Sequence, residues 1–113
     1  VKAANRGNTG ITIDTAHFYS GCSTLAEISA LPAQALAVFH MNDLIDKPKA
    51  AIGDYDRVMP GDGVIPLADI CREVKRIGFD GVASVEIFNH EFNKQNPETI
   101  AMTAFDKMKA FIG

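Results

Sequence analysis

The stretch at residues 81–88, GVASVEIF, constrains the fold most, because it is a nearly continuous apolar run that contains one carboxylate, Glu86. A run of this length and β-branched content is typical of a parallel strand covered on both faces. A carboxylate there must be paired, hydrogen-bonded or bound to a metal, since burying an isolated charge is costly. The sequence therefore predicts a buried strand that delivers a functional acid.

Two earlier stretches have the same form. Residues 11–14 are a short apolar strand that ends at Asp14, and residues 35–39 form another that delivers His40. Helical patterns follow the three strands, from a cap at Ser23 to about residue 31, from Pro66 to Gly78, and from Pro97 onward. This alternation predicts an α/β fold with parallel strands and a site at their carboxyl ends.

The connecting segments are expected to be loops. Residues 15–22, 41–65 and 89–96 show no clean period, and the long middle segment is rich in Asp, Pro and Gly. A loop of that length in a compact domain is usually functional or disordered. Within it we expect Asp43 to support the site or to cap the loop, and the glycines at 61 and 63 to permit a tight backbone.

The length of the chain indicates which fold with parallel strands it forms. A closed eight-stranded barrel needs about 200 residues or more, and the chain has 113 residues and three βα units. It lacks an initiator Met, and its opening VKAANRGNTG is typical of the end of a helix followed by a turn. We therefore expect residues 1–113 to be the carboxyl-terminal three βα units of a TIM barrel, and the exposed sheet edges to favour a homo-oligomer.

Composition excludes several functions. The formal net charge of -3 argues against a nucleic-acid partner. No apolar run is long enough for a membrane span, and no signal peptide is recognisable. Cys22 and Cys71 lie far apart without a CxxC spacing, which is typical of reduced thiols in a cytoplasmic protein.

The three strand-end residues, Asp14, His40 and Glu86, are oxygen and imidazole donors without a thiolate among them. This mixture suits a divalent Mn, Mg, Co or Zn ion rather than a thiolate-bound structural zinc. Each residue alone has an ordinary explanation: a capping aspartate, a core histidine, a buried ion pair. Three such residues at equivalent strand ends favour a metal site.

Two further residues are candidates for contacts with a substrate. His17 follows Asp14 by three positions, and it could donate a hydrogen bond to substrate, act as another ligand, or belong to the loop. Arg57 is the only arginine of the long middle segment, and its charge could orient a hydroxylated or carbonyl compound and offset developing enolate charge. The alternative for Arg57 is a surface pair with Asp54 or Asp56.

Four segments in order carry a family resemblance: DTAHFYSGCS, VFHMND, DRVMPGDG and GFDGVASVEIFN. They resemble the sugar phosphate isomerase/epimerase family with the xylose-isomerase-like barrel, and most closely its inosose (2-keto-myo-inositol) isomerase branch. The resemblance covers essentially the whole chain and corresponds to the last three βα units of that barrel. Four motifs in one order are specific, although each alone would be weak.

The resemblance implies a divalent metal held by Glu, Asp, His and Glu from four strands, of which the last three match Asp14, His40 and Glu86. It also implies that Glu86 is a catalytic acid/base and that His17 and Arg57 contact oxygens of a small polyhydroxy carbonyl substrate. The implied reaction of carbohydrate metabolism transfers a proton through an enediolate. The strand that carries the first Glu has no counterpart here, so the chain alone is expected to bind metal weakly and to have little or no activity.

Three alternatives remain open. A dehydratase of the same barrel, of the inosose or dehydroshikimate type, would share the enolate step. An AP endonuclease of the same barrel is less favoured, because Val58 stands where its third metal site needs a histidine, and because the chain is acidic. The third alternative is a non-catalytic oligomerising fragment.

Overall fold

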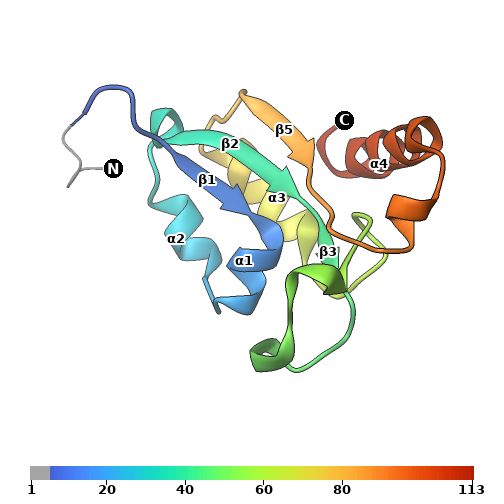
Figure 1. Ribbon diagram of the computed structural model, residues 1–113. Coiled ribbons are helices and arrows are strands. Elements are labelled where there is room, and N and C mark those ends of the chain that lie inside the picture. Colours follow the sequence, from blue (N-terminus) through green and yellow to red (C-terminus); the bar gives the residue numbers. More distant parts are fainter. Residues whose placement is uncertain (1–5) are drawn as a thin grey trace.

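A computed structural model describes residues 6–113 of the chain. Its centre is a sheet of parallel strands in the order β1 (Ile11–Asp14), β2 (Leu36–Met41) and β5 (Val82–Val85) (Figure 1). The predicted α/β fold with parallel strands is therefore confirmed. The helix end expected at the start of the chain lies outside the described residues.

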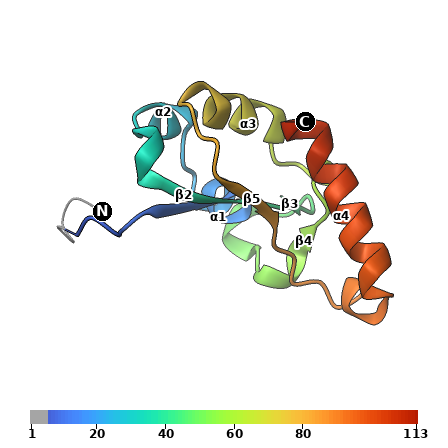
Figure 2. The same cartoon turned by 90° about the horizontal axis from the view of Figure 1, so that it is seen from above.

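Residues 6–113 form four α-helices beside the sheet: α1 (Thr15–Ser20), α2 (Leu25–Ser29), α3 (Leu67–Arg76) and α4 (Pro97–Ile112). Seen from above, α2 and α3 lie together on one side of the strands, and α4 lies against α3 and β5 (Figure 2). Among residues 6–113, no helix is long and apolar enough to cross a membrane.

The hydrophobic core lies between the sheet and the α2–α3 layer. Side chains alternate along a strand, so every second residue of the sheet points toward these helices. Each large apolar side chain buried there contributes about 1.5–3 kcal/mol. The strands and helices provide Ile13, Phe39, Met41, Ile28, Ile70 and Val74, all nearly inaccessible to solvent.

The opposite face of the sheet is open over part of its area. Val82 pairs with Val38, which lies two residues before His40 on β2, so Val82 and His40 share this face of the sheet. Val82 is 65% exposed. The expected strand at 81–88 is shorter than predicted, and Glu86 lies just beyond its end. The prediction that this strand is covered on both faces is wrong, because only one face is packed against helices of the described chain.

Two predicted loops contain regular structure. The segment at 15–22 begins with α1, because the Asp14 carboxylate caps it by accepting hydrogen bonds from the backbone N–H groups of Ala16 and His17. The segment at 41–65 contains a short antiparallel pair, β3 (Asp43–Leu44) with β4 (Arg57–Val58). Strands of two residues are too short to show a period, so no sequence pattern predicts them.

Smaller differences concern the helix ends. The N-cap of α2 is Thr24 rather than Ser23, and a capping box with Glu27 fixes this start. The starts of α3 and α4 at Pro66 and Pro97 agree with the prediction. On α4 the large apolar side chain of Phe105 remains 56% accessible.

The long segment is held together by Asp43, which is only 1% exposed. Its Oδ1 accepts hydrogen bonds from the N–H groups of Leu44 and Ile65, and its Oδ2 from those of Gly61 and Gly63. A Cβ at residue 63 would lie 2.2 Å from the carbonyl oxygen of Leu44, so glycine is required there. Of the two expected roles of Asp43, the structure shows the loop cap.

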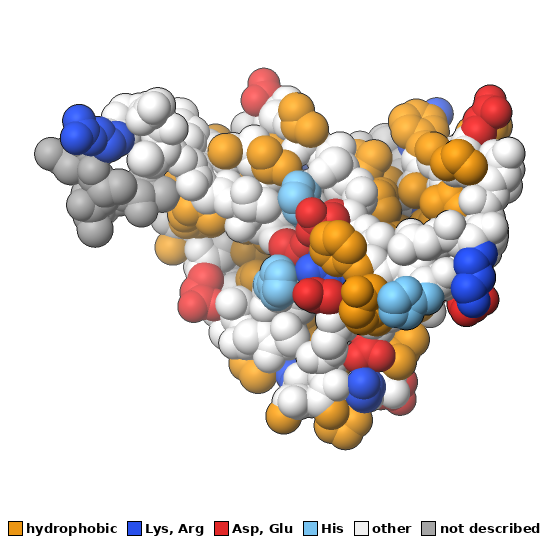
Figure 3. All heavy atoms as spheres, viewed as in Figure 1, with side chains coloured by type: hydrophobic (Ala, Val, Ile, Leu, Met, Phe, Trp, Pro, Cys, Tyr) orange, Lys and Arg blue, Asp and Glu red, His pale blue; other side chains and the backbone are white. Residues whose placement is uncertain are grey.

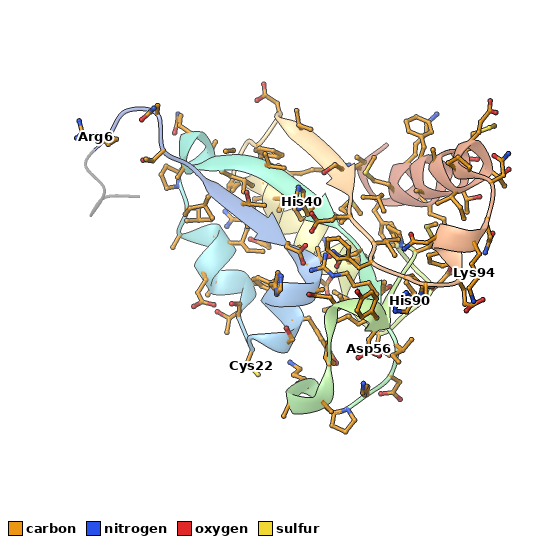
Figure 4. The ribbon with its side chains drawn as sticks, in the orientation of Figure 1. Arg6, Cys22, His40, Asp56, His90 and Lys94 are labelled. Atoms are coloured by element: carbon orange, nitrogen blue, oxygen red, sulfur yellow. The ribbon has the colours of Figure 1, made fainter. Side chains whose placement is uncertain are left out.

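The two cysteines give a simple test of this packing. Cys71 is buried in the core, and burial raises the pKa of its thiol to about 11, whereas Cys22 is exposed near the end of α1 (Figure 4). At pH 8 only about one Cys71 in a thousand would be a thiolate. We expect one thiol per chain to react rapidly with an aromatic disulfide reagent and the second only after denaturation. Two equally fast thiols would contradict this core.

Candidate metal centre

The register of the parallel sheet brings the three predicted ligands to one place. Asp14 pairs with His40 across β1 and β2, and His40 pairs with Ser84 across β2 and β5. Glu86 follows Ser84 by two positions, so its side chain points to the same face. Three residues far apart in the sequence therefore meet at the carboxyl ends of three strands.

The three side chains offer a compact donor set. Nδ1 of His40 lies 3.9 Å from Oδ2 of Asp14 and 3.5 Å from Oε2 of Glu86, and one donor atom of each residue lies within 4.8 Å of the others. Asp14 is buried, while His40 and Glu86 are 26% and 40% exposed. Two carboxylate oxygens and one imidazole nitrogen, open to solvent on one side, fit a divalent cation such as Mn, Mg, Co or Zn.

The two carboxylate oxygens of Asp14 have different partners. Oδ1 caps α1, which leaves Oδ2 directed at the cluster. Asn42 fixes this orientation, because its Nδ2 donates to Oδ2 of Asp14 at 3.1 Å and to the backbone oxygen of Glu86 at 3.2 Å. The Thr15 hydroxyl in turn accepts from the Asn42 N–H at 2.9 Å and lies 2.9 Å from its Oδ1.

Sequence analysis missed Asn42 and Thr15, although both are completely buried. Their positions offered a weak signal: each comes directly after a strand that delivers a predicted ligand. A polar residue at such a place has to find a partner inside the protein. Here Asn42 bonds to two of the predicted ligand residues and to Thr15, so the pair ties the ends of all three strands together.

Arg57 reaches the cluster from β4 and is only 2% exposed. Its Nη1 donates to Oδ2 of Asp14 at 2.9 Å and to Oε2 of Glu86 at 3.0 Å. Arg57 does pair with Asp54, whose Oδ1 lies 3.5 Å from its Nη2, but the guanidinium is buried and not at the surface as that alternative had it. Asn89 anchors the Arg57 backbone by donating from Nδ2 to its carbonyl oxygen at 3.0 Å.

His17 lies beside the guanidinium, at the exposed edge of the cluster. Its Nε2 is 3.2 Å from Nη2 of Arg57, and because a guanidinium only donates, Nε2 acts as the acceptor. The ring of Phe88 lies over Arg57, with 5.3 Å between the ring centroid and Cζ. On the surface, acidic, basic and histidine side chains gather around these residues near the middle of one face (Figure 3).

Figure 4 shows that His40 and His90 lie at different places in the structure. His40 stands on β2 over the sheet, whereas His90 lies in the connection that leads from β5 to α4. His90 stacks on Tyr55 with 4.1 Å between the ring centroids. His90, the third histidine of the chain, thus lies outside the donor set of Asp14, His40 and Glu86.

A family profile described as "Xylose isomerase-like TIM barrel" matches residues 1–111. Together with the parallel sheet and the residues at its strand ends, this match shows that the chain belongs to the xylose isomerase-like TIM barrel family. The resemblance noted from the sequence motifs is therefore confirmed.

The sequence is also similar to individual members of this family. The chain is 35% identical over 104 residues to an inosose isomerase of Bacillus subtilis, covering 92% of this chain and 37% of the relative. It is 33% identical over 106 residues to an inosose isomerase of Halalkalibacterium halodurans, covering 94% and 38%. The chain thus spans well under half the length of the curated relatives it matches.

Solved structures agree with the fold. A crystal structure of the IolI protein with a binding zinc atom superposes with a TM-score of 0.94 at 32% identity, covering 99% of this chain and 40% of that one. A xylose isomerase domain protein from Alicyclobacillus acidocaldarius gives a TM-score of 0.81 at 26% identity, covering 98% and 39%. The described chain therefore has the fold of part of such a barrel.

Proposed function

We propose that this chain supplies the metal ligands and one acid/base carboxylate of a sugar isomerase site that acts on a small polyhydroxy ketone of the inosose type. The observation that carries the proposal is the meeting of Asp14, His40 and Glu86 at the carboxyl ends of three parallel strands. The names of the relatives as inosose isomerases, and the zinc in the IolI structure, support the substrate class and the cation.

In this proposal Asp14, His40 and Glu86 hold the divalent cation. A cation at this place would polarise a substrate carbonyl and make the neighbouring C–H group more acidic. The donor set contains no thiolate, so Mn, Mg and Co are ligand-compatible alongside Zn.

Glu86 is the proposed proton carrier. Its Oε2 faces Arg57 and His40, while no hydrogen bond within residues 6–113 uses Oε1. The side chain is 40% exposed, so this second oxygen can meet a substrate. Glu86 would remove the proton from the hydroxyl-bearing carbon next to the ketone, leaving an enediolate, and a proton would return at the former carbonyl carbon.

Arg57 and His17 would orient the substrate. Arg57 donates to the carboxylates of Asp14 and Glu86, and Nε2 of His17 lies 3.2 Å from its Nη2. A guanidinium is a fixed donor, and a neutral imidazole can both donate and accept, so together they suit neighbouring hydroxyl and ketone oxygens. The two free cysteines favour the cytoplasm as the location of such an enzyme.

A hybrid barrel tests this proposal. In the hybrid barrel, the 104 matched residues of the Bacillus subtilis inosose isomerase are replaced by their counterparts from this chain. We expect the folded hybrid with Mn²⁺ to interconvert 2-keto-myo-inositol with its isomer in D₂O, and the product to carry deuterium, both followed by NMR. A folded hybrid that binds metal but neither isomerises the ketone nor exchanges its proton would refute the proposal.

We further propose that the chain self-associates through the edges of its sheet. Within the described part of the chain, the outer edges of β1 and β5 have no partner strand. A groove of about 430 Å³ beside β5 is lined by apolar residues such as Ile87, Ile100 and Ala104. Exposed apolar surface next to unpaired strand edges favours association with a second copy.

Sedimentation of the purified chain measures this association. We expect a dimer or a larger species, and a Val82→Lys variant that shifts the population toward the monomer, because an edge lysine discourages strand pairing. Lys94→Gln, which changes an exposed lysine paired with Glu91, is the control. A monodisperse monomer at high concentration would contradict the prediction.

A further inference from the structure

The two carboxylates that we assign to the cation already share one positive partner, Arg57. Its Nη1 donates to Oδ2 of Asp14 at 2.9 Å, to Oε2 of Glu86 at 3.0 Å and to the backbone oxygen of Glu86 at 3.2 Å. These two side-chain oxygens are also the atoms that face Nδ1 of His40. Nη1 of Arg57 therefore contacts the same two carboxylate oxygens that a cation at this site would use.

The hydrogen bonds of Asp14 leave little room for an additional partner. Oδ1 accepts from the N–H groups of Ala16 and His17, while Oδ2 accepts from Nδ2 of Asn42 and from Nη1 of Arg57. A carboxylate has about four lone-pair sites in total. A cation that binds Oδ2 must therefore displace either Asn42 or Arg57.

Asn42 is the donor that stays. It is fully buried, and its Nδ2 also holds the backbone oxygen of Glu86. Its own backbone N–H is bound by the Thr15 hydroxyl. Moving this side chain would break its bonds to Asp14, Thr15 and the backbone oxygen of Glu86, whereas the guanidinium end of Arg57 can turn about its own side chain.

Arg57 also has a second place to go. Its Nη2 already lies 3.2 Å from Nε2 of His17 and 3.5 Å from Oδ1 of Asp54, which is 63% exposed. Its buried Nε has no hydrogen-bond partner among residues 6–113, so no bond holds the guanidinium at that atom. A shift toward His17 and Asp54 would keep the positive charge paired and bring it to the solvent side of the cluster.

We propose that Arg57 and the divalent cation compete for Asp14 and Glu86. Binding of the cation would then release the guanidinium toward His17 and Asp54, at the exposed edge of the cluster where the proposed substrate would bind. This inference rests on the proposed function, because the same residues hold the cation. Its consequence is an order of events: the arginine becomes available to substrate oxygens only after the cation has bound.

Calorimetric titration with Zn²⁺ tests the competition. An Arg57→Met variant removes the positive charge and keeps much of the side-chain volume, so we expect Zn²⁺ to bind at least about tenfold more tightly than to the unchanged chain. Arg76→Met, which changes an exposed arginine paired with Glu73, is the matched control and should leave the affinity within about twofold. Equal or weaker binding by the Arg57 variant would overturn the inference and leave the proposed site intact.

A second measurement needs no substitution. In the unchanged chain with ¹⁵N-labelled arginine, the hydrogen bonds of Nη1 should slow rotation of the Arg57 guanidinium, and saturating Zn²⁺ should restore fast rotation in the NMR spectrum. Restricted rotation that survives saturation would show that Arg57 keeps its bonds, and would overturn the inference. If no form of the chain binds Zn²⁺, both this inference and the proposed metal site fail.

Discussion

Glu86→Gln in the hybrid barrel is expected to lower kcat for inosose isomerisation by about a thousandfold or more, which corresponds to about 4 kcal/mol of transition-state stabilisation. The substitution keeps the shape of the side chain but removes the proposed base and one proposed anionic ligand of the cation. It also leaves Arg57 with Asp14 and, at 3.5 Å, Asp54 as its carboxylate partners. Steady-state kinetics, with deuterium incorporation read on the same samples, measures the effect.

The control for this experiment is Glu91→Gln. Glu91 lies in the connection after β5 and pairs with Lys94 on the surface, away from the donor set. Its replacement should change kcat by less than about twofold, because exposed ion pairs contribute little. A Glu86→Gln hybrid that keeps more than a tenth of the activity would mean that another residue carries the proton.

Asp43→Ala is expected to lower the free energy of unfolding of the chain by at least about 3 kcal/mol, because it leaves two buried and two part-buried backbone donors without their acceptor. The Asp43 carboxylate accepts hydrogen bonds from four backbone N–H groups, those of Leu44, Gly61, Gly63 and Ile65. This loss is a large share of the roughly 5–15 kcal/mol that stabilises an ordinary domain. Urea denaturation followed by circular dichroism gives the value.

A neighbouring aspartate separates this effect from general damage to the segment. Asp62 is an exposed residue of the same turn and pairs with Lys107 of α4. Asp62→Ala should cost less than about 1 kcal/mol. Similar losses for the two variants would contradict the assignment of Asp43 as the centre of this hydrogen-bond network.

The sequence was sufficient for the three parallel strands and for the place where their ends meet. Residues 11–14, 35–39 and 81–88 are apolar runs separated by helical patterns, and parallel strands bring their carboxyl ends to one edge. Asp14 and His40 come out directly opposite each other because both end such a run. These features depend on local pattern and on general rules of chain connection.

The remaining details depend on contacts between distant segments, which no local pattern encodes. The bonds that Asn42 makes to Asp14 and Glu86, and the burial of Arg57, exist only once three strands and the long middle segment have come together. Helix α1 was missed for a related reason: six residues are too few for a period, and its start depends on one oxygen of Asp14.

An X-ray anomalous difference map from crystals of the hybrid barrel grown with Mn²⁺ tests the proposed metal site most directly. We expect one strong peak within bonding distance of carboxylate oxygens of Asp14 and Glu86 and a ring nitrogen of His40, and loss of this peak in a His40→Ala crystal. A well-ordered crystal with Mn²⁺ bound elsewhere, or with no peak at these residues, would contradict the proposed site.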